Sequence, residues 1–354
     1  MKLEALTMGW IIWGCQLVLA QRFPPSQYFR PIRACRAHQP LRTNVSSDVL
    51  ACTRETFRVS NVKDPDADKN ILQISQENGY VIDSYNLTTS DGYILTLFRI
   101  SGGRKSPAKR GKPSVLLLHG WGNSCEAWIA LPNDKNIVYM LADAGWDVWL
   151  GNFRGSSFSL QHTRLNADRD PSYWDFTFHE MGLFDFPMML DQARRVSEND
   201  KVFVIGHSQG ATAILVAASE VPGINEKIHA AYFMAPAVYL VKSFLHLVQN
   251  ARSCSFRYYD RGAKENLRRY GSREPPSYNL NRVWVPVYIF YAEQDGNVTP
   301  SDVQRLREAL PSETVRDVVR VNDDTFNHLD FLVAKDANVL VYKPLIHRMT
   351  EFNK

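Results

Sequence analysis

The sequence predicts an α/β protein in which helices cover both faces of a mostly parallel sheet. Short apolar runs, typical of buried parallel strands, recur along the chain. Helix-like stretches lie between these runs, and strands that alternate with helices form a mainly parallel sheet. One of the runs also passes through a serine between two glycines directly into a helix-like stretch. We therefore expect a doubly covered sheet whose carboxyl edge carries the chemistry.

The pattern of a packed domain begins near residue 71. After a turn at residues 90–92, residues 93–100 alternate between apolar and polar, which predicts a strand. Buried strands are predicted at residues 114–118, 146–150, 201–205, 230–234 and 285–291. Helices are predicted at residues 137–144, 185–196 and 211–219. We assign residues 61–236 and 285–354 to this core.

The N-terminal region has the pattern of an export signal. Lys2 precedes an apolar stretch at residues 5–20 that ends in small residues, so we predict a signal peptide at residues 1–20, cleaved before Gln21. An uncleaved anchor is the alternative, but the stretch is short for a membrane span. No other segment is apolar enough to cross a bilayer. Residues 21–60, rich in arginine and proline, are expected to form a loosely ordered arm, with a pro-segment as the alternative.

Cysteines and glycosylation motifs agree with export. Four cysteines remain after signal removal and permit two disulfides: Cys35, Cys52, Cys125 and Cys254. The first two form the favoured local pair, and their spacing fits no zinc site. Asn-x-Ser/Thr sequons stand at Asn44, Asn86 and Asn297. The net charge of +4 is too small to indicate nucleic-acid binding, and no motif for it is visible.

A tight turn is predicted where residues 201–205 reach Gly206. The segment from Gly206 to Gly210 reads Gly-His-Ser-Gln-Gly, the Gly-x-Ser-x-Gly pattern of a nucleophile elbow. It stands between a strand and a helix, as this turn requires, and the glycines leave room where a side chain would strike a neighbouring element. Ser208 is therefore the predicted nucleophile.

A serine hydroxyl needs a base, and in this turn context an acid and then a histidine follow along the chain. His328 is the predicted base because it stands in a loop after the strand-like residues 315–321. The other histidines after Ser208 lie in strand-like or helix-like segments: His229, His246 and His347. Asp295, just after the strand at residues 285–291, is the predicted acid. Glu293 is the alternative, and Asp330 is expected to be a local structural or solvated group.

An oxyanion hole needs two backbone N–H groups aimed at the developing charge. We expect one from Gln209, the residue after the nucleophile. The other is expected from the loop after residues 114–118, where Trp121 follows His119 and Gly120.

These residues closely resemble the acid lipase family of the α/β-hydrolase fold, which contains gastric and lysosomal acid lipases and arthropod digestive lipases. The resemblance runs from about residue 70 to residue 352 and is carried by residues 91–95, 119–120, 142–155, 174–181, 206–210, 259–260, 275–280 and 327–331. It implies a triad of Ser208, Asp295 and His328, an oxyanion hole at Trp121 and Gln209, and no cofactor.

The sequence departs from this family between the nucleophile and the acid. Only 87 residues separate Ser208 from Asp295, far fewer than in the family. We therefore expect residues 237–284 to form a reduced cap over the site, with an amphipathic helix at residues 238–248.

Together these features predict a secreted or lysosomal serine ester hydrolase. The resemblance implies a lipase acting on triacylglycerol or sterol esters, with a lipid ester as partner at a lipid–water interface. A short-chain carboxylesterase or a catalytically idle lipid-binding protein is the alternative, because most of the cap is missing. A peptidase on the same fold is a third and weaker one.

Overall fold

The computed structural model describes residue 66 and residues 69–239, 249–250, 253 and 255–354. The predicted signal peptide and arm, the sequon at Asn44, the Cys35–Cys52 pair, His246 and most of the amphipathic residues 238–248 lie outside the described part. No helix within the described part is long and apolar enough to span a membrane. Cys125 is a buried free thiol. It therefore takes no part in the two disulfides that the cysteine count permits.

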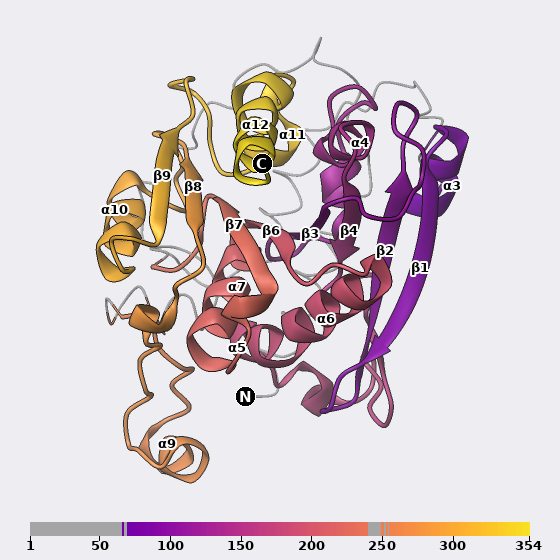
Figure 1. Cartoon of the computed structure of the whole chain (residues 1–354). Helices are drawn as coiled ribbons and strands as arrows, with labels where there is room; N and C mark the ends of the chain where they lie inside the picture. Colours follow the sequence, from indigo (N-terminus) through magenta and orange to yellow (C-terminus); the bar gives the residue numbers. More distant parts are fainter. Residues whose placement is uncertain (1–65, 67–68, 240–248, 251–252, 254) are drawn as a thin grey trace, which may run out of the picture.

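The described residues form a nine-stranded sheet in the order β1-β2-β4-β3-β6-β7-β8-β9, with the short β5 paired to β2 (Figure 1). The neighbours along the order β4-β3-β6-β7-β8-β9 pair in parallel. Strand β2 pairs antiparallel with both β1 and β4. The strands are β1 (Val81–Thr88), β2 (Tyr93–Gly102), β3 (Ser114–Leu118), β4 (Asp147–Gly151), β5 (Gln161–His162), β6 (Val202–His207), β7 (Ile228–Met234), β8 (Val287–Tyr291) and β9 (Val315–Arg320). The predicted mostly parallel sheet is confirmed.

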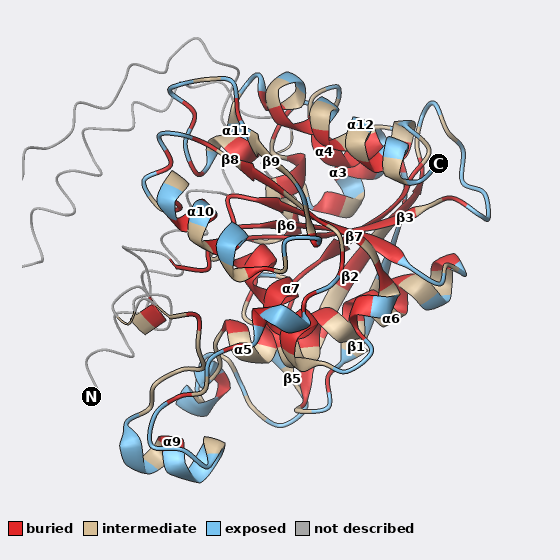
Figure 2. Ribbon diagram, turned by 60° about the vertical axis from the view of Figure 1, so that its left-hand side comes forward, coloured by how far each residue is buried: buried red, intermediate tan, exposed pale blue. Residues whose placement is uncertain are grey.

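Helices cover both faces of this sheet, as predicted. Figure 2 shows α3, α4, α11 and α12 over one face and α5, α6 and α7 over the other. The α-helices are α3 (Ile71–Glu77), α4 (Ile137–Asp143), α5 (Phe178–Glu180), α6 (Phe186–Ser197), α7 (Gln209–Glu220), α9 (Ala263–Tyr270), α10 (Pro300–Ala309), α11 (Asp330–Val333) and α12 (Lys343–Phe352). The 3-10 helices are η1 (Cys125–Ile129), η2 (Pro171–Trp174), η4 (Asn225–Lys227) and η5 (Leu280–Arg282), and the π-helices are η3 (Met181–Asp185) and η6 (Asn338–Tyr342).

The central strands place their carboxyl ends at one level. All residues of β3, β4 and β6 are buried, which explains why these segments are mostly apolar. In the parallel register of β3 with β6, Leu118 lies opposite Gly206. The loop after β3 and the turn after β6 therefore emerge side by side, and both carry residues of the predicted site.

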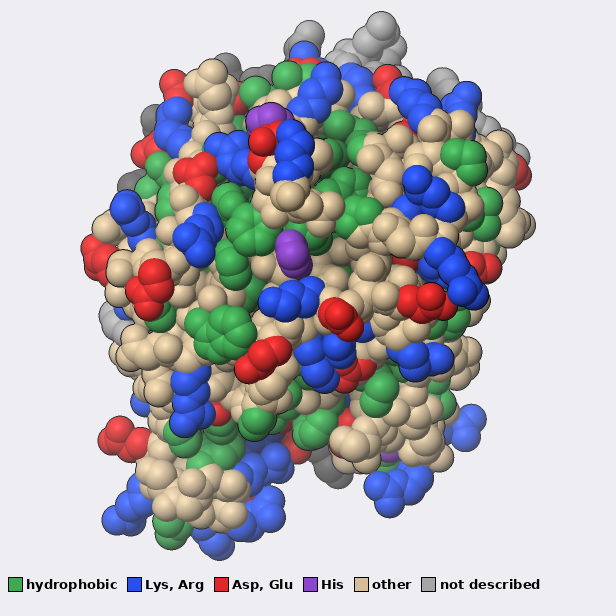
Figure 3. All heavy atoms as spheres, viewed as in Figure 1, with side chains coloured by type: hydrophobic (Ala, Val, Ile, Leu, Met, Phe, Trp, Pro, Cys, Tyr) green, Lys and Arg blue, Asp and Glu red, His purple; other side chains and the backbone are tan. Residues whose placement is uncertain are grey.

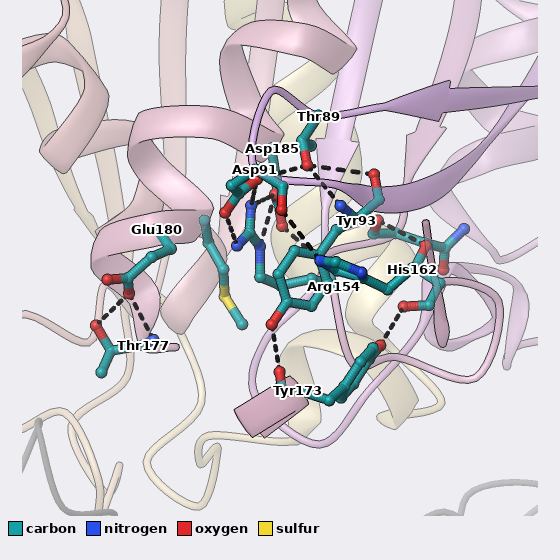
Figure 4. A network of polar contacts seen from close by, with 12 residues as sticks. Thr89, Asp91, Tyr93, Arg154, His162, Tyr173, Thr177, Glu180 and Asp185 are labelled. Atoms are coloured by element: carbon teal, nitrogen blue, oxygen red, sulfur yellow. Dashed lines mark hydrogen bonds and ion pairs between the residues drawn. The ribbon is translucent and has the colours of Figure 1, made fainter. Parts of the chain in front are cut away.

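A buried ion-pair network holds the loop after β4 against the rest of the fold (Figure 4). The Arg154 guanidinium donates to Asp185 at 2.9 and 2.7 Å and to Asp91 at 2.6 and 3.1 Å. It also stacks over the Tyr93 ring, with its Cζ 4.0 Å from the ring centroid. The Asp185 carboxylate further accepts from the backbone N–H of Arg154 at 3.0 Å. Two carboxylates and an aromatic face thus compensate one buried cation.

We predict that Asp185→Ala lowers the free energy of unfolding by about 3–5 kcal/mol, because it leaves the buried Arg154 with an incomplete set of partners. Asp191→Ala, in α6, removes half-exposed pairs with Lys227 and Arg194 and should cost no more than about 1 kcal/mol. Urea unfolding followed by circular dichroism measures both. Equal losses in the two variants would show that the network does not carry the stability assigned to it.

Candidate functional site

The turn that carries Ser208 is strained. Its backbone has φ 52° and ψ −117°, a conformation that residues other than glycine rarely adopt. The two glycines that frame it are required by space: a Cβ at Gly206 would lie 2.5 Å from the Ala211 nitrogen. A Cβ at Gly210 would lie 2.3 Å from the Leu118 carbonyl oxygen. The predicted tight turn between β6 and α7 is therefore present, and only glycine fits on either side of it.

The structure brings the three predicted residues into one hydrogen-bonded chain. His328 Nδ1 lies 2.8 Å from Asp295 Oδ2, and His328 Nε2 lies 2.9 Å from Ser208 Oγ. A carboxylate can only accept, so Nδ1 carries the proton and Nε2 is left to accept from the Ser208 hydroxyl. All three residues are buried, with Asp295 at 3% and His328 at 9% exposure.

The geometry separates the two candidate acids. Asp295 Oδ1 accepts from the backbone N–H groups of Asn297 and Val298, both at 2.8 Å, which leaves Oδ2 for His328. Glu293 is exposed and instead accepts from the Arg320 guanidinium at 3.1 Å. Asp295 and not Glu293 therefore contacts the histidine.

The remaining acid and histidine candidates take structural places. Asp330 accepts from the backbone N–H of Asn327 at 2.8 Å beside the start of α11, and burial raises its pKa. His229, at the start of β7, packs against the Phe352 ring, with the two ring centroids 5.3 Å apart. His347 lies within α12.

The loop after β3 lies directly against the nucleophile. A Cβ at Gly120 would be 3.2 Å from the Ser208 Cβ. Trp121 follows in this loop, and Gln209 is the first residue of α7. The first N–H groups of a helix have no intrahelical partner, so the backbone N–H of Gln209 is one of those open to an anion. The oxyanion hole at Trp121 and Gln209 stays a prediction.

His119 holds the loop after β3 through two hydrogen bonds. Its Nε2 accepts from the backbone N–H of Phe153 at 3.2 Å, so its Nδ1 carries the proton and donates to the Gly120 carbonyl at 2.8 Å. Burial lowers the pKa of His119 to about 4. The imidazole therefore stays neutral near neutral pH and keeps both hydrogen bonds.

His207, which the sequence analysis did not single out, joins the nucleophile to the base. Its Nε2 lies 3.0 Å from the His328 carbonyl oxygen and donates to it. Burial, with a smaller contribution from the nearby His328, lowers the pKa of His207 to about 3. Within the described part of the chain, its Nδ1 has no hydrogen-bond partner. The signal was its place inside the Gly-x-Ser-x-Gly pattern, but only the fold shows that it reaches a residue 121 positions away.

The arrangement is suited to nucleophilic attack by a serine on a carbonyl group. It contains a hydroxyl, a histidine that accepts its proton and a carboxylate that orients the histidine. No group of three or more His, Cys, Asp or Glu side chains that could hold a metal ion occurs among the described residues.

Two family models match the chain. The model of the partial α/β-hydrolase lipase region matches residues 71–131, and that of the α/β-hydrolase fold matches residues 113–258. The second match contains Ser208 and the loop after β3, whereas His328 and Asp295 lie beyond it.

Curated relatives named as lipases are 27–29% identical to this chain. Lipase 1 of Drosophila melanogaster is 28% identical, with 81% of this chain and 80% of the relative covered. Gastric triacylglycerol lipase of Bos taurus is 28% identical, with 82% and 94% covered. Lipase member K of Homo sapiens is 28% identical, with 82% and 93% covered. The alignment with the Bos taurus lipase spans 377 positions, more than the 354 residues of this chain, so the relative carries residues without a counterpart here.

Solved structures share the fold. An esterase of Pyrococcus furiosus has a TM-score of 0.51 at 18% identity, with 78% of this chain and 92% of that chain covered. An esterase of Thermogutta terrifontis has a TM-score of 0.51 at 14% identity, with 77% and 100% covered.

We predict that His207→Phe lowers kcat for an ester about 10- to 100-fold with little change in KM, because the loop of His328 loses the donor that aligns it with Ser208. His207→Gln keeps an N–H donor and should recover much of the loss. Steady-state kinetics, with thermal unfolding measured alongside, test this. A glutamine variant as slow as the phenylalanine variant would exclude the hydrogen bond as the cause.

Proposed function

The chain belongs to the acid lipase family of the α/β-hydrolase fold and is a carboxylic ester hydrolase, and we propose that it works through an acyl intermediate on Ser208. The observation that carries this proposal is the unbroken chain of hydrogen bonds from Asp295 through His328 to Ser208. The strained turn supports it further, because strain of this kind gathers at active sites.

In the proposed reaction, the Ser208 oxygen attacks the ester carbonyl while His328 Nε2 takes the hydroxyl proton. Asp295 holds the imidazole in the required tautomer and stabilises the imidazolium. The backbone N–H groups of Gln209 and Trp121 stabilise the oxyanion, and the positive end of the α7 dipole adds to this field. His328 then passes the proton to the leaving alcohol. Water, activated by the same histidine, releases the acid and restores Ser208.

The substrates are proposed to be lipid esters such as triacylglycerols or sterol esters. One relative is named a gastric triacylglycerol lipase, which supports this class. The surface beside the base supports it too, because Leu329, the next residue after His328, is 49% exposed, and Val333, four residues on, is 38% exposed. Apolar side chains at the mouth of a site favour an apolar acyl group.

The shortened segment between Ser208 and Asp295 favours a second candidate, a carboxylesterase for short acyl chains. The proposed cap is residues 237–284, since only 87 positions separate Ser208 from Asp295 in this chain. A smaller cap leaves less apolar surface to hold a long acyl chain. The two candidates share the same triad and differ only in substrate length.

We further propose a secreted or lysosomal location, supported by the predicted signal peptide and the sequons. Asn86 is exposed on β1 and accessible to a glycan. Asn297, in contrast, lies half-buried in the turn that holds Asp295, and its backbone N–H donates to that carboxylate at 2.8 Å.

We predict that Ser208→Ala abolishes hydrolysis of p-nitrophenyl butyrate and labelling by a fluorophosphonate probe, because it removes the hydroxyl that His328 contacts. The exposed Ser312 provides the control, and Ser312→Ala should behave like the unchanged protein. Labelling that persists in the Ser208 variant would overturn the assignment of the nucleophile.

A long-chain triacylglycerol emulsion separates the two candidates. Hydrolysis of both the emulsion and the butyrate ester is expected of a lipase. Cleavage of butyrate alone would identify the short-chain carboxylesterase. A folded protein that cleaves neither and is not labelled would favour the idle lipid-binding alternative.

We also predict that Asp295→Asn lowers kcat by about 10⁴-fold, because an amide no longer selects the tautomer with the proton on Nδ1. Glu293→Gln, in the same loop, should change kcat less than twofold, about the limit of the measurement, since it contacts only Arg320 at the surface. A large loss in the Glu293 variant would reverse the assignment of the acid.

A further inference from the structure

Helix α9 projects away from the body of the molecule on the segment between β7 and β8 (Figures 1 and 2). Its burial pattern is inverted. Asn266, a polar residue, is buried at 1% exposure, whereas Leu267, the apolar residue beside it, is 54% exposed. A surface helix normally turns its apolar side chains inward.

The buried amide explains how the helix manages without an apolar interior. Asn266 donates to the Asp260 carboxylate at 2.8 Å and to the Arg273 carbonyl at 3.0 Å. Its carbonyl oxygen accepts from the backbone N–H of Arg261 at 2.9 Å. The amide therefore ties together the residues before and after the helix, and Leu267 remains outside.

Ion pairs fix α9 to the core. The Asp175 carboxylate accepts from Arg261 at 2.6 Å and from Arg269 at 3.2 Å. Trp174, directly before this anchor, is 38% exposed. The projecting helix is thus held in place, with a partly exposed indole at its foot.

The outward face of α9 is basic, with Leu267 as its large apolar residue. Lys264, Leu267 and Arg268 are exposed and stand at helical spacings of three and four residues, so they share one face. Lys and Arg outnumber acids around it: Arg257, Arg261, Lys264, Arg268, Arg269 and Arg273 against Asp175, Asp260, Glu265 and Glu274. Figure 3 shows Lys and Arg side chains over this projecting lobe, at the lower left.

We infer that this face of α9 docks the enzyme onto a lipid surface that carries anionic headgroups. Lys264 matches the negative charge of such a surface, and Arg268 adds a second exposed cation while its guanidinium also donates to the Glu265 carboxylate at 2.9 and 2.6 Å. Leu267 between them is placed to enter the boundary between headgroups and acyl chains. Trp174 has the amphipathic ring that is favoured at the same depth. Charge complementarity selects an anionic surface over a neutral one.

This inference rests on the proposed function, because lipid esters are presented to an enzyme at such surfaces. The segment that carries α9 also begins at the site. The backbone N–H of Ala237 donates to the Ser208 carbonyl at 3.3 Å, and the Ala237 carbonyl accepts from the Thr212 hydroxyl at 2.7 Å. The segment that contains α9 is therefore attached at its start to the turn that carries Ser208.

Flotation with vesicles tests the inference on the full chain. The protein is mixed with vesicles of phosphatidylcholine alone or with one fifth phosphatidylglycerol, and the bound fraction is measured at low and high salt. The unchanged protein should bind the anionic vesicles, and high salt should release it. Lys264→Ala combined with Arg268→Ala should lower the partition constant about 25-fold, since each cation near such a surface contributes about fivefold. Leu267→Ser should also weaken binding.

A matched control removes the same charge elsewhere. Lys109 and Arg110 are exposed in the connection before β3, at the edge of the sheet opposite Ser208. Their neighbours in the sequence, Ala108 and Gly111, are much smaller than Leu267. Their double alanine variant should bind as the unchanged protein does. Equal loss in both double variants, or equal binding to neutral and anionic vesicles, would overturn the inference.

Hydrolysis of soluble p-nitrophenyl butyrate should be unchanged in all these variants, because none lies at the site. If that activity is absent from the unchanged protein, the proposed function fails while flotation still gives its own answer. Retention on an anionic polysaccharide column that depends on α9, without binding to vesicles, would assign the face to a different partner and overturn the lipid docking.

Discussion

The turn at Ser208 is the constraint on which the site depends. Ser208 is the single residue between the end of β6 and the start of α7, and this abrupt change of direction requires the strained conformation seen there. Neighbouring strands hold it there: the Ser208 N–H donates to the Met234 carbonyl at 2.9 Å, and its carbonyl accepts from Ala237. The strain persists because this packing over-determines it, at a cost of about 1–3 kcal/mol. In return, the hydroxyl stands clear of the helix and faces His328.

Two buried histidines near the turn are neutral and add no charge to the site. His119 and His207 are both buried, and burial lowers their pKa values to about 4 and about 3. Neither carries a charge that would oppose a positive His328. Each serves as a hydrogen-bond donor to a loop of the site, His119 to the loop of Gly120 and His207 to the loop of His328. Buried polar groups of this kind align a site when they have partners.

The segment between β7 and β8 carries a basic projecting helix fixed by Asp175. If α9 binds anionic lipid, then the short segment between β7 and β8 provides affinity for the surface. The core, with Ser208, Asp295 and His328, provides the chemistry. A reduced cap and a lipid substrate are then compatible, since the surface itself supplies apolar surroundings.

The sequence by itself determined the mostly parallel sheet and the tight turn at Ser208, because strand runs, glycine spacing and helix pattern are local signals. It also ordered the acid and the base along the chain, but it left Asp295 and Glu293 as alternatives two residues apart. Only the tertiary structure decided between them, since the turn after β8 aims one carboxylate at His328 and the other at Arg320. The contact of His207 with His328, the burial of Arg154 and the exposure of Leu267 were likewise decided by folding. These features join residues far apart in the chain or depend on what packs around them, and no local pattern encodes that.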